Sequence, residues 1–478
     1  MKRIKTALII MTLLLIFTGC ISQTTPKTDD GYYLYTQACA FHESHGLTWG
    51  SPDMIELNKF LKTGGVPSDT VVRLLKQEKK AFSLILNAHK TVLWNLPDNT
   101  SFSYQTRSPS IGEWLGINLV AAAQGIKLYQ DKRPQEVLRF LTPFNTTGLK
   151  ISGAGTLTHI ITHIASRTIQ YPVMISSIDD LPVEVLAREL VDAKEQYALI
   201  PTVGESMVGE QHMAINTVTE LFADIRQDEN LKNSRQRMIQ DLTKQAVEKS
   251  VLERISDEKI LSISQWEAQV ISDLKRLQLF YTNVMSTCTS AELLELNDEM
   301  EKKIDEIGSE MDYKAAIDGW NLFITNQVSG AFSMPDAERL HKQVGKEISR
   351  SFLRMMISGV GTYGLTYRRY IASERLLLIR LAVRLYDFQE GENPSSLQQL
   401  VDKGLLNAEV IIDPVSGKTF LTVKNKPIEA YSVDKDLDDD GGALWDNKIK
   451  SGDLILIPLE KKWSLQQDKS SVSGEPER

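Results

Sequence analysis

Five aspartates fall within seven residues near the C-terminus of the chain, between positions 434 and 440, and two glycines follow them. The order Asp-x-Asp-x-Asp-Gly, which begins at Asp436, is the first half of a calcium-binding loop, in which alternate carboxylates point inward and the glycine permits a sharp turn. We therefore expect a calcium site with these ligands: Asp436, Asp438, Asp440, Gly442, Asp446 and Asn447. Strand-like flanks argue against an ordinary EF-hand, and the alternative is a solvated acidic turn.

His159 and His163 stand four residues apart in a segment with helical periodicity, a spacing that puts two imidazoles on one helix face and can bind zinc. A zinc peptidase of this type needs a glutamate directly after the first histidine as general base, and Ile160 stands there instead. Glu210 and His212 could complete a metal site from another helix. The alternative is that both histidines line a polar seam between helices.

Cys39, His42 and His45 also offer metal-ligand chemistry at short spacing. No second ligand pair follows at a recognisable interval, so we interpret this stretch as a loop. The sequence contains no Gly-x-Ser-x-Gly nucleophile elbow and no phosphate-binding glycine loop. The residues therefore indicate a non-enzymatic protein.

The N-terminus reads as an export signal, because Lys2, Arg3 and Lys5 precede an apolar run at residues 7–17 that is short for a membrane-spanning helix. The signal ends in Phe-Thr-Gly-Cys, which resembles the lipobox of bacterial lipoproteins. That resemblance implies cleavage before Cys20 and lipid modification of its thiol. An ordinary signal peptide cut nearby and an uncleaved anchor helix are the alternatives. Ile21, and not Asp, follows the cysteine. In this respect the chain resembles the lipoproteins of two-membrane bacteria that are sorted to the outer membrane.

The charge balance bears on the partners. Lys and Arg number 54 against 62 Asp and Glu, which gives a formal net charge of −8. Broad nucleic-acid binding needs a basic surplus, so we expect no nucleic-acid partner.

Besides Cys20, the chain contains Cys39 and Cys288, and outside the cytoplasm these form either one disulfide or two buried thiols.

Helical periodicity dominates the elements that must position these residues. We predict a mainly α fold, an irregular helical array or bundle, with a small α+β module at the C-terminus. Helices are predicted at residues 68–93, twice within 110–141 with a break near Asp131–Pro134, and at 154–170, 181–197, 203–226, 229–246, 263–286 and 291–311, the last opened by a capping box of Thr289 and Glu292. A further long helix carries arginines expected to pair with surrounding acids: Arg368, Arg369, Arg375, Arg380 and Arg384.

The predicted organisation has five parts. They are a lipoprotein signal peptide at 1–19, a lipid-anchored tether and irregular lead-in at 20–67, the helical body at 68–362, the long helix and small α+β module with the acidic loop at 363–462, and a disordered tail at 463–478. In the order of a helical tract followed by a small C-terminal module, residues 110–460 resemble uncharacterised helical lipoproteins of planctomycete-like bacteria.

The C-terminal module resembles the major pseudopilin of type II secretion systems over residues 376–458. The resemblance is carried by the helix end at Tyr386-Asp387 and Glu390-Gly391, by Pro394 with Leu397, Leu400 and Val401, by the turn Asp413-Pro414 with Gly417, and by Tyr431-Ser432 before the acidic loop. It implies a small α+β fold and a calcium site. A pseudopilin carries its long helix at the very N-terminus and polymerises through it, whereas this helix is internal, so only the fold and the ion site carry over.

These observations predict a lipid-anchored extracytoplasmic protein of the cell envelope, held to a membrane by its N-terminal lipid. We expect a non-enzymatic interaction or scaffold protein that binds a protein partner, with its terminal module stabilised by calcium. One alternative is a metal-dependent hydrolase that uses His159 and His163. Another is an accessory subunit of an envelope secretion apparatus.

Overall fold

The computed structural model describes residues 30–45, 47, 50–96, 111–153, 157–205, 289–293, 360–423, 429–446, 449, 451–459 and 463, with isolated positions between 208 and 220 and between 268 and 275. This part of the chain is mainly helical, as predicted. The signal segment with Cys20, the tail after 463, the predicted helix 229–246, half of the predicted helix 203–226, and most of the predicted helices 263–286 and 291–311 lie outside the described residues.

Two helices occupy the segment that we expected to be irregular. Helix α2 spans Gly31–Glu43, and α3 spans Pro52–Thr63. The Asp30 side chain accepts the N–H of Tyr32 and caps α2, whereas Ser51 caps α3 directly before a proline at the first helical position. The expectation of irregular structure is therefore corrected for residues 31–63. Apolar positions on both helices are buried, which is why the segment packs rather than extends.

The predicted helix at 68–93 is two helices, α4 (Asp69–Gln77) and α5 (Lys79–Lys90), which meet at Glu78. The predicted break before Pro134 is confirmed, because α6 spans Ile111–Gln130 and α7 spans Pro134–Gly153. Helix α8 (Leu157–Asp179) is longer than the predicted 154–170, and α9 spans Val183–Ala198. The capping box is also confirmed, since Glu292 Oε2 accepts the N–H of Thr289 at 2.6 Å.

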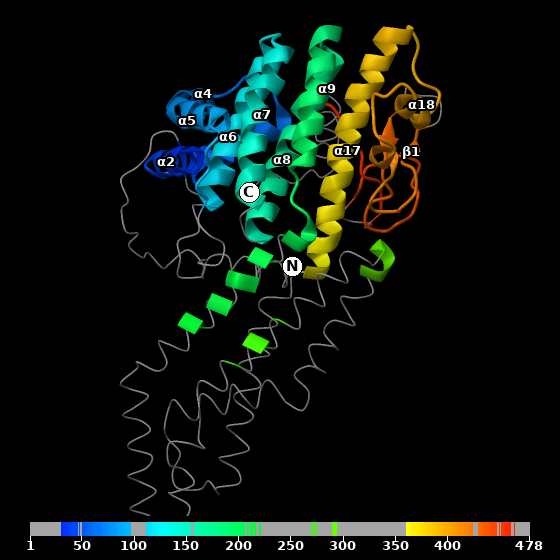
Figure 1. Ribbon diagram of the computed structural model, residues 1–478. Coiled ribbons are helices and arrows are strands. Elements are labelled where there is room, and N and C mark those ends of the chain that lie inside the picture. Colours follow the sequence, from blue (N-terminus) through cyan, green and yellow to red (C-terminus); the bar gives the residue numbers. More distant parts are fainter. Residues whose placement is uncertain are drawn as a thin grey trace, which may run out of the picture.

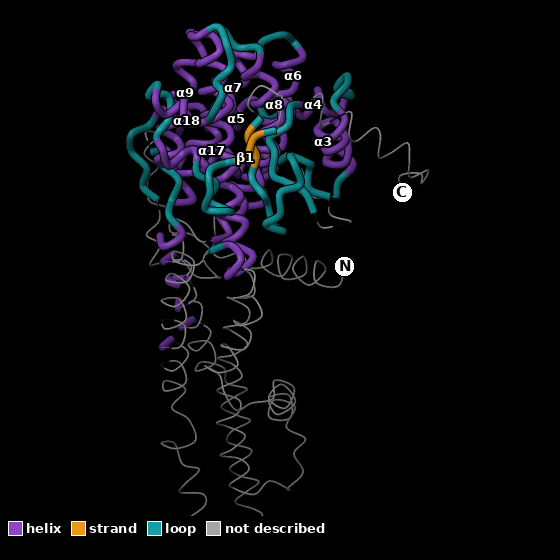
Figure 2. The backbone as a smooth tube through the Cα atoms, turned by 90° about the vertical axis from the view of Figure 1, so that its right-hand side faces the viewer, coloured by secondary structure: helices purple, strands orange, loops and turns teal. Residues whose placement is uncertain are grey.

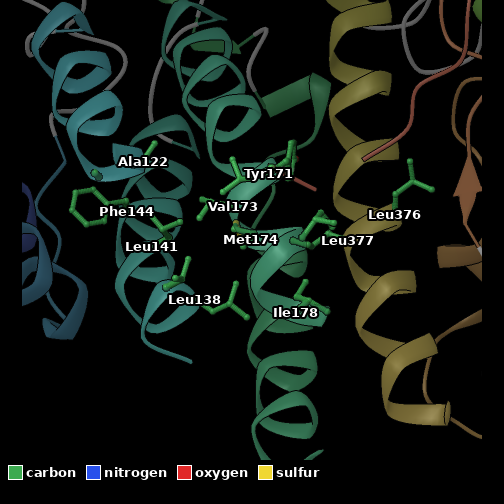
Figure 3. Close-up of a cluster of buried hydrophobic side chains, with 14 of the residues drawn as sticks. Ala122, Leu138, Leu141, Phe144, Tyr171, Val173, Met174, Ile178, Leu376 and Leu377 are labelled. Carbon is green, nitrogen blue, oxygen red and sulfur yellow. The ribbon is translucent and has the colours of Figure 1, made fainter. Parts of the chain in front are cut away.

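Helix α8 lies at the centre of the described structure. It packs against α6, α7 and α17 (Val360–Glu390), and α17 also packs against α9 (Figure 1). The core is continuous from the N-terminal helices to α17. Figure 3 shows side chains of four helices meeting in it: Ala122 on α6, Leu138, Leu141 and Phe144 on α7, Tyr171, Val173, Met174 and Ile178 on α8, and Leu376 and Leu377 on α17.

The 31-residue helix α17 is the element to which the other parts of the structure are joined. Three of its arginines pair with acids as expected: Arg369 with Asp434, Arg380 with Asp179, and Arg384 with Asp387. The other two make these hydrogen bonds: Arg375 donates to the Tyr197 hydroxyl and the Ile412 carbonyl, and Arg368 donates to Ser290 Oγ. Together these bonds attach α8, α9 and the C-terminal module to one helix.

Most of the C-terminal module lies on the side of α17 away from α8 (Figure 1) and consists largely of loops (Figure 2). Near its end the chain returns to α8, where the N–H of Leu459 donates to Ser176 Oγ at 2.8 Å. It contains α18 (Leu397–Asp402), a short 3-10 helix η2 (Ala408–Ile411) and two antiparallel strands, β1 (Leu421–Thr422) and β2 (Ala430–Tyr431). Ser432 then bridges Leu454. The predicted long helix and short helix are both present, and in the described part of the module the strand-like runs pair as β1 with β2 and through isolated bridges. Within the described residues, no helix is both long and apolar enough to cross a membrane.

Candidate functional site

The acidic loop lies between two backbone segments that pair with each other. Ser432 and Leu454 exchange main-chain hydrogen bonds of 3.2 and 2.9 Å, and the chain between them forms the loop. Gly441 and Gly442 both have positive φ angles, 68° and 82°, which a residue without Cβ adopts freely. The glycines that follow the aspartates therefore allow the turn that the sequence predicted.

Three aspartates of the loop are already tied to its own backbone and side chains. Oδ2 of Asp436 accepts the N–H of Gly452 at 3.1 Å, and Oδ2 of Asp440 accepts the Ser451 hydroxyl at 2.9 Å. Oδ1 of Asp439, which was not among the predicted ligands, accepts the Tyr431 hydroxyl at 2.8 Å. Oδ1 of Asp439 also accepts the N–H of Gly441 at 2.9 Å, so these carboxylates stabilise the loop in the form that the structure shows.

Asp453 faces this loop from the returning segment, and the sequence interpretation missed it. Its side chain is 1% exposed. Oδ2 accepts the N–H of Gly442 at 2.8 Å, whereas buried Oδ1 has no hydrogen bond of ordinary geometry, although the backbone N–H of Asp440 is near enough to the carboxylate to lower its pKa. Burial raises the pKa of Asp453 to about 6, and the nearby charges of Asp439 and Asp440 add to that rise in pKa. The sequence feature that could have indicated this residue is the position of Asp453 directly before the apolar run Leu454–Leu456.

The remaining predicted ligands are placed less completely. Asp438 lies in the loop, and its N–H is 3.5 Å from Oδ1 of Asp436. Asp446 pairs through its backbone with Ser451, and Asn447 lies outside the described residues. Among the described residues, no group of three or more His, Cys, Asp or Glu side chains is arranged to hold a metal ion. The described carboxylates alone therefore do not form a closed cage, although every donor present is an oxygen, the type that calcium prefers.

A buried ion pair joins the start of this loop to α17. The carboxylate of Asp434 is completely buried and binds the guanidinium of Arg369 at two points, Nε to Oδ1 and Nη2 to Oδ2, the latter at 2.9 Å. Asp434 has a φ of 50°, which is uncommon for a residue with a side chain. The loop is therefore held to the long helix by a charge-assisted contact two residues before Asp436.

The two histidines of α8 are buried, and His163 lies in a polar seam between helices, which was the alternative to a metal site. Nε2 of His163 lies 3.0 Å from the Tyr370 hydroxyl on α17, and its ring packs directly against Gly148 on α7. Burial lowers the pKa of His163 to about 3, with Arg167 contributing, and lowers the pKa of His159 to about 4. Both rings are therefore neutral at physiological pH.

Glu210, a possible ligand from another helix, lies outside the described residues, whereas His212 is described. In the described part of the chain, His159 and His163 belong to no group of three or more His, Cys, Asp or Glu side chains that could hold a metal ion. The hydrolase alternative gains no further ligand from these residues.

The same face of α8 continues the seam with residues that the sequence interpretation did not single out. Arg167 binds Glu374 of α17 at two points, Nε to Oε1 at 2.6 Å and Nη2 to Oε2 at 3.2 Å. The Tyr171 hydroxyl donates to Oε1 of Glu374 at 2.8 Å. All three side chains are buried. The spacing of His159, His163, Arg167 and Tyr171 at every fourth residue was the signal for a polar face.

Cys39 and His42 lie on helix α2 rather than in a loop, so the loop interpretation is corrected. Cys39 is a buried free thiol, and burial raises its pKa well above the usual range. Nδ1 of His42 lies 2.8 Å from buried Glu78, and its other nitrogen faces Gly116. Cys39 lies among the apolar residues that α2 buries, which explains its burial, and a raised pKa keeps the thiol in its neutral, weakly nucleophilic form. Cys288 lies outside the described residues.

Comparison of the chain with protein-family models, with curated proteins and with solved structures finds no match. The functional argument therefore rests on the residues of this chain. The acidic loop with Asp453 is the arrangement that points most directly to a ligand, because a buried carboxylate oxygen there has no hydrogen bond of ordinary geometry.

Proposed function

We propose that this protein is a lipid-anchored scaffold of the cell envelope whose C-terminal module binds calcium. The observation that carries the proposal is the buried carboxylate of Asp453, which has one oxygen without a hydrogen bond of ordinary geometry and faces an acidic glycine loop. An unpaired buried carboxylate destabilises a fold unless a cation or proton compensates it. Calcium supplies that compensation and accepts the six to eight oxygens that carboxylates and main-chain carbonyls provide.

The attachment of the acidic loop to α17 supports the proposal that a bound cation stabilises the C-terminal module together with the helical body. Asp434 binds Arg369 of α17, and Glu374, slightly further along the same helix, binds Arg167 of α8. A cation that orders the loop therefore stabilises a segment whose backbone is fixed to the helical body. We propose that the exposed helical surface of this body binds a protein partner.

The order of elements supports a pseudopilin-like module, although its helix is internal. A long helix ends at Gly391 with a positive φ of 75°, a short helix follows, and a tight turn at Asp413 brings Gly417 N–H to its carbonyl at 2.8 Å. Strands β1 and β2 then precede the acidic loop. This order favours an accessory role in an envelope secretion apparatus as the second candidate function.

Thermal unfolding of the full mature chain tests the calcium part of the proposal. The melting temperature is measured in EDTA, in millimolar calcium and in millimolar magnesium. Calcium should raise it by about 1 °C for each kcal/mol of binding free energy, because the unfolding entropy of a chain of this length is large. Magnesium should raise it less, because its octahedral shell releases water reluctantly. Equal melting temperatures in EDTA and calcium would show that the loop is a solvated acidic turn and that the calcium proposal is wrong.

A further inference from the structure

An exposed apolar loop lies directly beside Asp30, the first residue that the structure describes. Val92 is 100% exposed and Leu93 is 45% exposed, although both side chains are apolar. The N–H of Gly31 donates to the carbonyl oxygen of Leu93 at 2.9 Å, and the N–H of Asn95 donates to Oδ1 of Asp30 at 3.1 Å. These bonds fix the loop next to the first described residues of the chain.

An aromatic ring and basic side chains surround these apolar residues. The indole of Trp94 lies over Gly31, and the ammonium group of Lys150 is 4.8 Å from its ring centroid. Exposed Lys90 ends helix α5 directly before the loop. Tryptophan and lysine are typical of the boundary between lipid headgroups and acyl chains, where the ring is partly buried and the ammonium group meets anionic headgroups.

The tether length determines which face of the body lies nearest to a lipid anchor at Cys20. Ten residues lead from Cys20 to Asp30. A flexible chain of that length spans about 17 Å on average and at most about 35 Å. Helix α6 alone, with 20 residues, is about 30 Å long. The body is therefore longer than the mean reach of the tether, so the face around Asp30 is held toward the bilayer.

We infer that residues 92–94 form a membrane-contact loop, which places Val92 and Leu93 among the lipids while Lys90 and Lys150 lie near anionic headgroups. The inference rests on the lipid anchor of the proposed function, because two apolar side chains bind a bilayer weakly on their own. Tethering by the anchor keeps the loop at high local concentration beside the membrane. The loop then orients the body, so that one end of the helices faces the lipid.

A tryptophan introduced at Val92 tests this contact, and Val66 provides the matched control. Val66 is 94% exposed and also apolar, but it follows α3 at the other end of α6, where Gln130 donates to the carbonyl oxygen of Gly65 at 2.8 Å. Full-length Val92→Trp and Val66→Trp lipoproteins are reconstituted into phosphatidylcholine vesicles with roughly one-third phosphatidylglycerol. Half of each preparation contains brominated acyl chains, which quench tryptophan on contact.

The emission added by Val92→Trp should fall at least twofold in brominated vesicles, whereas that added by Val66→Trp should stay constant. Flotation of the vesicles reports the anchor separately. If the protein floats and both added tryptophans are equally unquenched, the membrane-contact loop is wrong and the anchor stands. If the native protein does not float, the anchor is wrong. In that case the same variants are coupled to a maleimide lipid through the Cys20 thiol, in a Cys288→Ala background so that Cys288 does not react. Quenching of the added tryptophans in brominated vesicles then tests whether residues 92–94 contact the membrane.

Discussion

Arg167 on α8 and Glu374 on α17 form a two-point ion pair inside the protein, with distances of 2.6 and 3.2 Å and side chains that are 3% and 7% exposed. Tyr171 donates a third hydrogen bond to the same carboxylate. Because both side chains are buried, loss of one partner leaves an uncompensated charge in the core. The pair therefore fixes how α17, and with it the C-terminal module, sits on the helical body.

Glu374→Ala should lower the free energy of unfolding by about 3–5 kcal/mol, because Arg167 would remain charged and buried. Urea unfolding of the full chain measures the change. The matched control is Glu136→Ala, which removes an exposed partner of Arg133 and should have little measurable effect. A double variant, Arg167→Met with Glu374→Leu, should recover much of the loss. Equal effects of Glu374→Ala and Glu136→Ala would contradict the importance of the buried pair.

Gly148→Ala should destabilise the protein by about 1–3 kcal/mol, because a Cβ at this position on α7 would overlap the ring of His163. Gly125→Ala on α6 is the control, since its Cβ would lie 3.4 Å from the nearest atom, Cδ1 of Leu141. That substitution should be neutral or stabilising, as alanine favours a helix by up to about 1 kcal/mol over glycine. Thermal melts that rank the two variants in the opposite order would show that α7 and α8 are not this close.

His163 should make the protein acid-sensitive. Its folded pKa of about 3 lies below the unfolded value of about 6.5, so the unfolded state binds more protons and stability falls as the pH drops below that value. Between pH 7 and pH 5 the loss should be about 2 kcal/mol from this residue. Arg167 and Tyr370 face the ring, and neither provides a negative charge that would stabilise the imidazolium.

The measurement compares wild-type protein with His163→Gln in urea at both pH values. The stability advantage of the wild type should shrink by about 2 kcal/mol from pH 7 to pH 5, because glutamine does not titrate. Other groups, including Asp453, titrate in both proteins and cancel in the difference. A gap that stays constant over this range would show that His163 is not buried as a neutral ring.

Much of the helical fold could be predicted from the sequence, because local signals determine it. Pro134 after a polar break predicts the start of α7, and Thr289 with Glu292 predicts a capped helix start. The division at Glu78 could not be predicted, since its buried contact with His42 comes from a helix distant in sequence. Tertiary packing of this kind overrides a continuous helical pattern.

The site was predictable only in part for the same reason. The aspartates and glycines of the loop are adjacent in the sequence, so the turn could be recognised. Asp453 reaches the loop through the pairing of Ser432 with Leu454, and Glu374 reaches Arg167 through helix packing. Partners that are 203 to 207 residues apart leave no local spacing to recognise. A polar residue at every fourth position of α8 was the only trace of the seam.

Cys20→Ser should prevent lipidation and leave unprocessed precursor or protein that is no longer bound to membranes. Mass spectrometry of the mature protein and its distribution between membrane and soluble fractions measure this. Cys39→Ala is the control, because that thiol is buried on α2 and should not affect processing. A Cys20→Ser protein of unchanged mature mass in the membrane fraction would show that the lipoprotein prediction is wrong.

Asp453→Asn should remove the calcium-dependent rise in melting temperature and, in EDTA, raise the melting temperature above that of the wild type. The amide removes a buried negative charge whose Oδ1 has no hydrogen bond of ordinary geometry, so the fold without calcium gains stability while the ion loses a ligand. Asp438→Ala should also abolish the calcium effect, whereas Asp402→Asn on α18, far from the loop in sequence, should preserve it.

The same carboxylate should make calcium binding depend on pH. Burial raises the pKa of Asp453 to about 6, so near and below that pH a proton competes with the cation for this side chain. The difference in melting temperature between millimolar calcium and EDTA should therefore be largest at pH 7 to 8 and should shrink toward pH 5. In Asp453→Asn this pH dependence should disappear. A calcium effect that persists unchanged in Asp453→Asn would show that the ion, if bound, lies elsewhere in the loop.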